Sequence, residues 1–300
     1  ARVRVSVSPD PRSKTYTTTD DFRAGQLVTL KSEDDQLTTG FFPSAYDFVW
    51  AVVTAANKVV RLDANTARVV GEYRSAPENK GGSPSRIAVD SLGNAWIANR
   101  GDGSLVKIGL GQDNGHWVDR NSNGKLDTAV GQGSRFDWAA GEQPADEAIL
   151  LFVETGLSGL DHIALDKDDN IWAGNYQGVW RLYDGKTGTV IREETNPSRS
   201  IGGGGGYIDA DGIMLSVGQK FLHWDTSRPI SEFDPNFADG VRTGSWSSAR
   251  DREGNLWVTR DGTSTVEKFS PSGEKLGEFY HGNSWAQGIA IDQDGHIWIA

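Results

Sequence analysis

The stretch IAVDSLGNAWIANR, residues 87–100, contains an alternating apolar segment, an Asp, a Gly-Asn turn and a second apolar segment. An alternating strand that ends at a short turn with glycine, which tolerates positive φ, predicts a β-hairpin. In this hairpin Asp90 precedes the turn residue Gly93 by three positions and Trp96 by six. We interpret Trp96 as a large apolar anchor that points into the core.

Four later stretches share this spacing of Asp, turn residue and apolar anchor: IALDKDDNIWAGNY (163–176), YIDADGIMLSVG (207–218), SARDREGNLWVTR (248–260) and IAIDQDGHIWIA (289–300). Their anchors are Trp172, Leu215, Trp257 and Trp298, at intervals of 41–43 residues. Most hairpins are followed by a second alternating pair of segments. Four strands in about 42 residues, repeated along the chain, are typical of the blades of a β-propeller.

The repeat count predicts five complete blades and a sixth that has begun at the C-terminus. Trp50 heads an earlier unit, and the 76-residue interval from Trp96 to Trp172 holds one repeat plus an insertion over about 111–147. We therefore expect an all-β fold, a β-propeller of six or seven four-stranded blades over residues 46–300, with the last blade incomplete. The N-terminal segment, residues 1–45, contains the strand-like RVRVSVS (2–8), which could close the ring.

Composition excludes several functional classes. The chain of 300 residues contains no cysteine, so disulfides, thiol catalysis and zinc–thiolate sites are excluded. Its formal charge of −11 and the lack of a basic cluster argue against nucleic acid as a partner. No apolar run approaches 18 residues, so we expect no membrane span. Both ends look trimmed, which suggests a part of a larger surface protein that is secreted, periplasmic or on the cell surface.

The insertion contains DRNSNGKLD, residues 119–127, which resembles the start of a calcium loop. Calcium takes six to eight oxygen ligands, and alternate residues of a tight loop present their oxygens to one centre. The predicted ligands are Asp119, Asn121, Asn123, the backbone carbonyl of Lys125, and Asp127. An EF-hand would place Glu at the twelfth position, where this chain has Val130. The alternative is a polar surface loop without metal; if calcium binds, we expect it to order the insertion.

The Asp-x-x-Gly-Asn-x-Trp hairpins, each followed by a pattern such as VEKFSPSG, resemble the NHL-like propellers, and most of all the streptogramin lyase-like (virginiamycin B lyase-like) group. The resemblance covers residues 46–300. It implies a propeller and, in the lyase proper, two His and one Glu that act with magnesium near the channel mouth. The corresponding positions of this chain read WIANR, WAGNY and WVTRD, and none of them supplies the Glu.

Residues just before the first strand of each blade are expected at the channel mouth. They include Arg86, Asp161, His162, Trp246 and Gln287, a mixture that suits a carbohydrate or a peptide. The alternative is that these groups satisfy neighbouring strand ends. The five consecutive glycines of residues 202–206 suggest either close backbone approach or flexibility.

Two hypotheses of function follow, and the sequence leaves open whether the protein is an enzyme. The first is an exported, non-catalytic propeller that binds a carbohydrate or a protein or peptide ligand and is stabilised by calcium. The alternative is a metal-dependent lyase or hydrolase of the streptogramin lyase type. It would use His162 and His281 with magnesium, because the imidazole is the side chain that most readily exchanges protons near neutral pH.

Overall fold

A computed structural model describes residues 30–33, 36–39, 48–111, 115–139, 143–196, 198, 201–237, 247–260, 262–282, 286, 288–291 and 295–299. The chain divides into two compact units, Ala1–Asp47 and Phe48–Ala300. In the first unit, β1 (Leu30–Glu33) pairs antiparallel with β2 (Gln36–Thr39). The candidate ring-closing strand, residues 2–8, lies outside the described residues.

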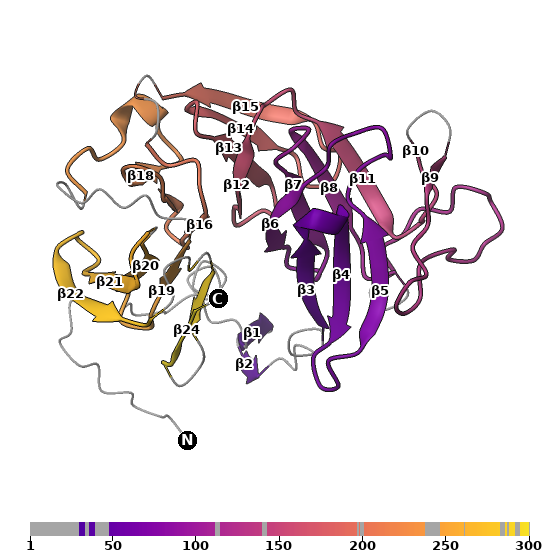
Figure 1. Ribbon diagram of the computed structural model, residues 1–300, viewed down its shortest axis with the longest axis horizontal. Coiled ribbons are helices and arrows are strands. Elements are labelled where there is room, and N and C mark those ends of the chain that lie inside the picture. Colours follow the sequence, from indigo (N-terminus) through magenta and orange to yellow (C-terminus); the bar gives the residue numbers. More distant parts are fainter. Residues whose placement is uncertain are drawn as a thin grey trace. The chain divides into compact units, whose positions relative to one another are not determined.

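The described part of the second unit consists of antiparallel sheets, each built from strands consecutive or nearly consecutive in the chain (Figure 1). Blade 1 contains β3 (Phe48–Val53), β4 (Lys58–Asp63) and β5 (Val69–Arg74). Blade 2 contains β6 (Pro84–Val89), β7 (Ala95–Asn99), β8 (Ser104–Ile108) and β11 (Ile149–Glu154). Blade 3 contains β12 (Leu160–Leu165), β13 (Ile171–Asn175), β14 (Val179–Tyr183) and β15 (Val190–Thr195).

Blade 4 contains β16 (Gly206–Ile208), β17 (Ile213–Ser216) and β18 (Leu222–Asp225). Blade 5 contains β19 (Ser248–Arg250), β20 (Leu256–Thr259), β21 (Thr265–Phe269) and β22 (Lys275–Tyr280). A further two-stranded sheet joins β23 (Ile289–Ile291) to β24 (Ile297–Ile299). The only helical segments of the described chain are the 3-10 turns η1 (Thr54–Ala56) and η2 (Ile230–Glu232). No described helix has the length and hydropathy needed to cross a membrane.

The all-β propeller fold is confirmed, but the predicted number of blades is wrong. The described residues form five blades, not six or seven, and only three of the five have four strands. The hairpin β23–β24 lies at the position of the predicted incomplete sixth blade, and it contains two paired strands. The prediction of six or seven added to the five complete repeats a blade begun at the C-terminus, which is a two-stranded sheet, and a ring-closing N-terminal strand, which lies outside the described residues.

Each repeat hairpin turns as its sequence predicts. In blade 2, Asp90 Oδ1 accepts hydrogen bonds from the backbone N–H of Leu92 (3.0 Å) and Asn94 (2.9 Å), so the carboxylate fixes the turn. The turn residue has a positive φ in all five hairpins. Four of these residues are glycine, and the fifth is Asp169, with φ 62°. The Asp and Gly of the repeat are therefore required by the local backbone, which explains their regular spacing.

The core lies between neighbouring blades, because the anchors of blades 2, 3 and 4 pack against the next sheet. Trp96 of blade 2 is fully buried with Leu160 and Ile171 of blade 3. Trp172 of blade 3 meets Trp224 of blade 4 edge to face, with ring centroids 4.9 Å apart. The first strand β12 also contacts the first strands β6 and β16 on either side of it. This arrangement brings the starting ends of the first strands together.

The insertion leaves blade 2 after β8 and returns at β11, which pairs with β8. Within it, β9 (Trp138–Ala139) pairs with β10 (Gln143–Pro144). The loop of the insertion is held in shape by Glu147, which is almost completely buried. Glu147 Oε1 accepts from Arg120 N and Oε2 accepts from Asp127 N, both at 2.8 Å.

Candidate functional site

Charged side chains gather where blades 2 and 3 meet, at the starting ends of β6 and β12. In an antiparallel pair, the start of one strand lies beside the end of its partner. Arg86 near the start of β6 and Arg100 just after β7 therefore share an edge, as do Asp161 on β12 and Tyr176 just after β13. We call these four residues the arginine–aspartate cluster.

Two irregularities of the backbone help to form this cluster. The pairing of β6 with β7 shifts between Pro84 and Arg86, and the pairing of β12 with β13 shifts between Leu160 and His162. Asp161 is thus the extra residue of a β-bulge. Bulges change the direction of side chains and interrupt regular alternation, so the orientation of Asp161 cannot be counted from the strand pattern.

The carboxylate of Asp161 is the centre of the cluster. Its side chain is 1% exposed, and its Oδ2 lies 3.4 Å from Arg86 Nη2 and 3.9 Å from Arg100 Nη1. Arg86 Nε also donates to the Asp161 backbone carbonyl at 3.0 Å. Burial raises the pKa of Asp161, and the two guanidinium groups oppose this rise because they favour the ionised carboxylate.

The remaining members are accessible from solvent to different degrees. The side chain of Arg86 is 21% exposed and that of Arg100 is 45% exposed. Burial, reinforced by the negative charge of Asp161, raises the pKa of Tyr176 to about 12, so this phenol stays protonated and can donate a hydrogen bond. With two arginines around one carboxylate, the cluster carries a net positive charge in a protein whose formal charge is −11.

His162 is fully buried and contacts blade 4. Its Nδ1 lies 2.7 Å from the Gly204 carbonyl oxygen and 3.0 Å from Ser216 Oγ, both in or next to blade 4. Its ring meets Trp180 edge to face at 4.9 Å. Burial lowers the pKa of His162 to about 4, so the imidazole is neutral at physiological pH. A Cβ added at Gly206 would lie 2.9 Å from His162 Cε1 and closer still to the backbone of Leu215, so close approach explains this glycine.

The other predicted site residues are not brought into the cluster. His281 follows β22, and its backbone N–H donates to Ser264 O at 2.8 Å. None of the contacts of His162 reaches His281. Trp246 and Gln287 lie outside the described residues. The structure pairs Arg86 with Asp161, whereas His162 makes its hydrogen bonds to Gly204 and Ser216.

Arg100 and Tyr176 were missed by the sequence analysis. They end the stretches WIANR and WAGNY, which were compared with the lyase motif only for the presence of a Glu. Both residues stand four positions after their anchors, Trp96 and Trp172, directly beyond the second strand. Because the two strands are antiparallel, this position lies at the same edge as the residues that were chosen, and the spacing would have identified it.

The side chains of the predicted calcium loop converge on one another. Asp127 Oδ2 accepts from Asn121 Nδ2 at 2.6 Å and from Asn123 Nδ2 at 2.9 Å. Asp119 Oδ2 accepts from the backbone N–H of Gly124 at 2.9 Å, and Asn123 Oδ1 from that of Lys125 at 2.7 Å. Val130, at the position of the EF-hand Glu, is 76% exposed. Among the described residues, no group of three or more His, Cys, Asp or Glu is placed to hold a metal ion, so a cation here would need the Asn side chains and backbone oxygens.

Comparison with known proteins gives a result for the fold alone. No family model and no curated protein matches the sequence. A streptogramin B lyase structure superposes with a TM-score of 0.57 at 15% identity, covering 90% of this chain and 74% of that chain. Virginiamycin B lyase from Staphylococcus aureus gives 0.57 at 17% identity, covering 89% and 82%. A catalytically inactive variant of that enzyme with quinupristin gives 0.54 at 17% identity, with the same coverage. This chain therefore has the β-propeller fold of the streptogramin B lyases, and the resemblance predicted from its hairpins is confirmed at that level.

Proposed function

We propose that the protein is an exported β-propeller that binds a carbohydrate or a peptide carrying a carboxylate, at the arginine–aspartate cluster. One observation carries the proposal: Arg86 and Arg100 both face the single buried carboxylate of Asp161. The side chain of Arg100 is 45% exposed at the starting ends of the first strands. Arginine recognises carboxylates in a planar, two-pronged geometry, so an anionic group of a ligand would pair with Arg100.

A binding role fits this cluster better than the lyase alternative does. Acid–base catalysis needs a group that can exchange a proton with the substrate and whose pKa lies near the working pH. The buried imidazole of His162, with a pKa of about 4, meets neither requirement. The lyase structures that share the fold support only the architecture, because propellers of one fold carry many functions.

Calcium is the second part of the proposal, with Asp119, Asn121, Asn123, Asp127 and the carbonyl of Lys125 as its ligands. The support is that Asn121, Asn123 and Asp127 lie together, since both amide groups donate to Asp127 Oδ2; turning the two amides would bring their oxygens towards a bound cation. Only two of these ligands are charged. Calcium sites with few carboxylates bind weakly, in the range of about 10⁻⁴–10⁻³ M found in extracellular modules. Such a site fills outside the cytoplasm, which is why we propose a secreted, periplasmic or cell-surface location.

Thermal melting of the whole chain tests both parts. Ligands that bind only the folded state raise its stability, by about 2.7 kcal/mol at a concentration one hundred times Kd. Calcium, but not EGTA, should raise Tm, and Asp119→Ala should abolish the shift. Asp184→Ala is the matched control, because Asp184 holds a similar turn outside the insertion through the N–H groups of Lys186 and Thr187. If the protein melts at the same temperature in calcium and in EGTA, the proposed calcium site is refuted.

The ligand is sought in the same assay with a panel of acidic and neutral oligosaccharides, acidic peptides and a streptogramin. We expect shifts from acidic members, reduced by Arg100→Gln and unchanged by Arg228→Gln. Arg228 is a suitable control because it is an exposed arginine paired with Asp225 and Glu232. A shift by the streptogramin that depends on magnesium would instead support the lyase alternative.

A further inference from the structure

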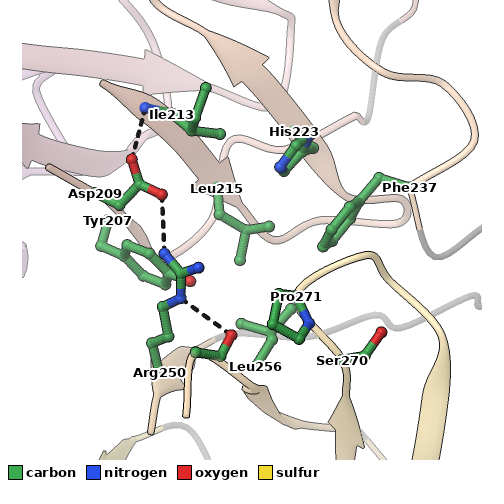
Figure 2. A pocket seen from close by; sticks show the side chains of 11 residues that line it. Tyr207, Asp209, Ile213, Leu215, His223, Phe237, Arg250, Leu256, Ser270 and Pro271 are labelled. Carbon is green, nitrogen blue, oxygen red and sulfur yellow. Dashed lines mark hydrogen bonds and ion pairs between the residues drawn. The ribbon is translucent and has the colours of Figure 1, made fainter. Parts of the chain in front are cut away.

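A pocket lies between blades 4 and 5, and the proposed function does not involve it. It is lined mainly by Tyr207, Asp209, Leu215, His223, Phe237 and Arg250 (Figure 2). Its empty space amounts to about 300 Å³ with the open mouth included, and its enclosed part has room for about one water molecule. Asp209 follows the first strand of blade 4, so the pocket lies near the finishing ends of the first strands, whereas the arginine–aspartate cluster lies at their starting ends.

The pocket occurs where the repeat departs from its usual residues. In blades 2 and 5 the anchor Trp pairs across the sheet with an Ala on the first strand and a Lys on the third. In blade 4 the same positions hold Tyr207, Leu215 and His223. The large ring has moved from the second strand to the first, and the long cationic side chain has been replaced by a short ring.

Lys107 shows what normally fills this space. At the interface of blades 2 and 3, its ammonium group lies 2.9 Å from Asp90 Oδ2, donates to Gly185 O of the next blade at 2.7 Å, and stands over the Trp96 ring at 5.3 Å. His223 in the same register position is too short to span the gap. Pro271 has the same position in blade 5 that Gly185 has in blade 3, in the turn after the third strand, and it lines the pocket.

The charge that Lys107 supplies to Asp90 is supplied in blade 4 by the neighbouring blade. Arg250 Nη1 lies 2.9 Å from Asp209 Oδ2 (Figure 2). Asp209 is therefore already neutralised, and a cation entering the pocket would be repelled by Arg250. Burial lowers the pKa of His223, so this ring is neutral as well, and it stacks on Phe237 at 4.3 Å with an interplanar angle of 3°. The remaining walls, Leu215 and Leu256, are apolar.

From this lining we infer that the pocket is a second binding site, which takes an uncharged planar aromatic ring such as the side chain of Trp or Tyr in a peptide. A flat ring can pack against the aromatic wall formed by Tyr207, His223 and Phe237, and ring–ring contacts are favourable beyond the area they bury. The ring would lie in the open mouth, against this wall, because the enclosed part has room for only about one water molecule. The site is independent of the arginine–aspartate cluster and does not rest on the function proposed for it.

Ligand-observed NMR with indole tests the site on the whole chain. We expect a single ring to bind weakly, and this method detects weak binding. Indole should show saturation transfer from the protein, whereas n-butylammonium, which mimics the Lys107 side chain, should not. His223→Leu should reduce the indole signal at least fivefold. His223→Phe, which keeps a neutral ring at this position, should retain it, and so should Arg100→Gln.

Thermal melts of each variant establish that it remains folded. Absence of an indole signal in the wild-type protein would overturn the inference. So would an unchanged signal in His223→Leu, loss of the signal in a folded His223→Phe, or preferential binding of n-butylammonium.

Discussion

The interface between blades 2 and 3 is closed, whereas the interface between blades 4 and 5 is open. In the first, Trp96 is 0% exposed and Lys107 reaches across to the next blade. In the second, Leu215 and His223 occupy the same two positions of the repeat and leave a pocket. Both interfaces are built from hairpins with the same Asp and a turn residue at positive φ, so the backbone is common and the side chains differ.

This difference separates two roles of the repeat. The Asp and Gly positions specify the hairpin, because they satisfy turn amides and permit positive φ. The anchor, its cross-strand partners and the third-strand cation determine how tightly neighbouring blades join. A departure at these positions changes the interface without changing the fold, and such departures indicate where a propeller has space for a ligand.

The largest expected effect is at the closed interface. Trp96→Ala removes a fully buried ring and the partner of Lys107, and should reduce the free energy of unfolding by about 3–5 kcal/mol. Leu215→Ala should cost less, about 2–3 kcal/mol, because it enlarges a pocket that already opens to solvent. Urea unfolding of both variants measures the difference. Equal losses would show that the two interfaces are packed alike.

A second expectation concerns pH and compares the fully buried His162 with the partly buried His223. The pKa of His162 is about 4 in the folded protein, against 6.5 when unperturbed, so the unfolded chain takes up the proton first as the pH falls. This contribution to stability is complete above about pH 6.5 and is lost as the pH falls towards 4. By pH 4.5 the loss amounts to about 2–3 kcal/mol.

Urea unfolding at pH 7 and pH 4.5 measures this loss, and His162→Gln should reduce the difference between the two values. His223→Gln should reduce it less, because His223 is only partly buried at the open interface. If His162→Gln leaves the pH dependence unchanged, the imidazole is not held neutral by burial.

The smallest effect comes from restoring the usual residues of the repeat in blade 4. Leu215→Trp alone should overpack the interface and Tyr207→Ala alone should enlarge the pocket, each at a cost of about 1–3 kcal/mol. The double variant recreates the Ala–Trp pair of the other blades, seen as Ala88 opposite Trp96. Its cost should be lower than the sum by about 1 kcal/mol, as expected for residues in contact. A double-mutant cycle that is strictly additive would show that the exchange of ring positions is not compensatory.

The fold was predictable because its signals are local. Asp90, Gly93 and Trp96 each act within one hairpin, and their spacing repeats with it. The orientation of His162 was not predictable by alternation, because the bulge at Asp161 interrupts the pairing of β12 with β13. The pocket was in principle visible in the aligned repeats, where Tyr207 and Leu215 replace the Ala and Trp of other blades. Its consequence depended on contacts between blades, which the sequence does not provide.

The most direct test of the proposed function is isothermal titration of the best acidic oligosaccharide or peptide from the melting panel. It would be titrated into the wild-type protein, Arg100→Gln and His223→Leu. We predict at least tenfold weaker binding by Arg100→Gln and binding within twofold of wild type by His223→Leu, because the cluster is formed by blades 2 and 3 and the pocket by blades 4 and 5. Full affinity in Arg100→Gln, or no acidic ligand that binds the wild-type protein, would contradict the account.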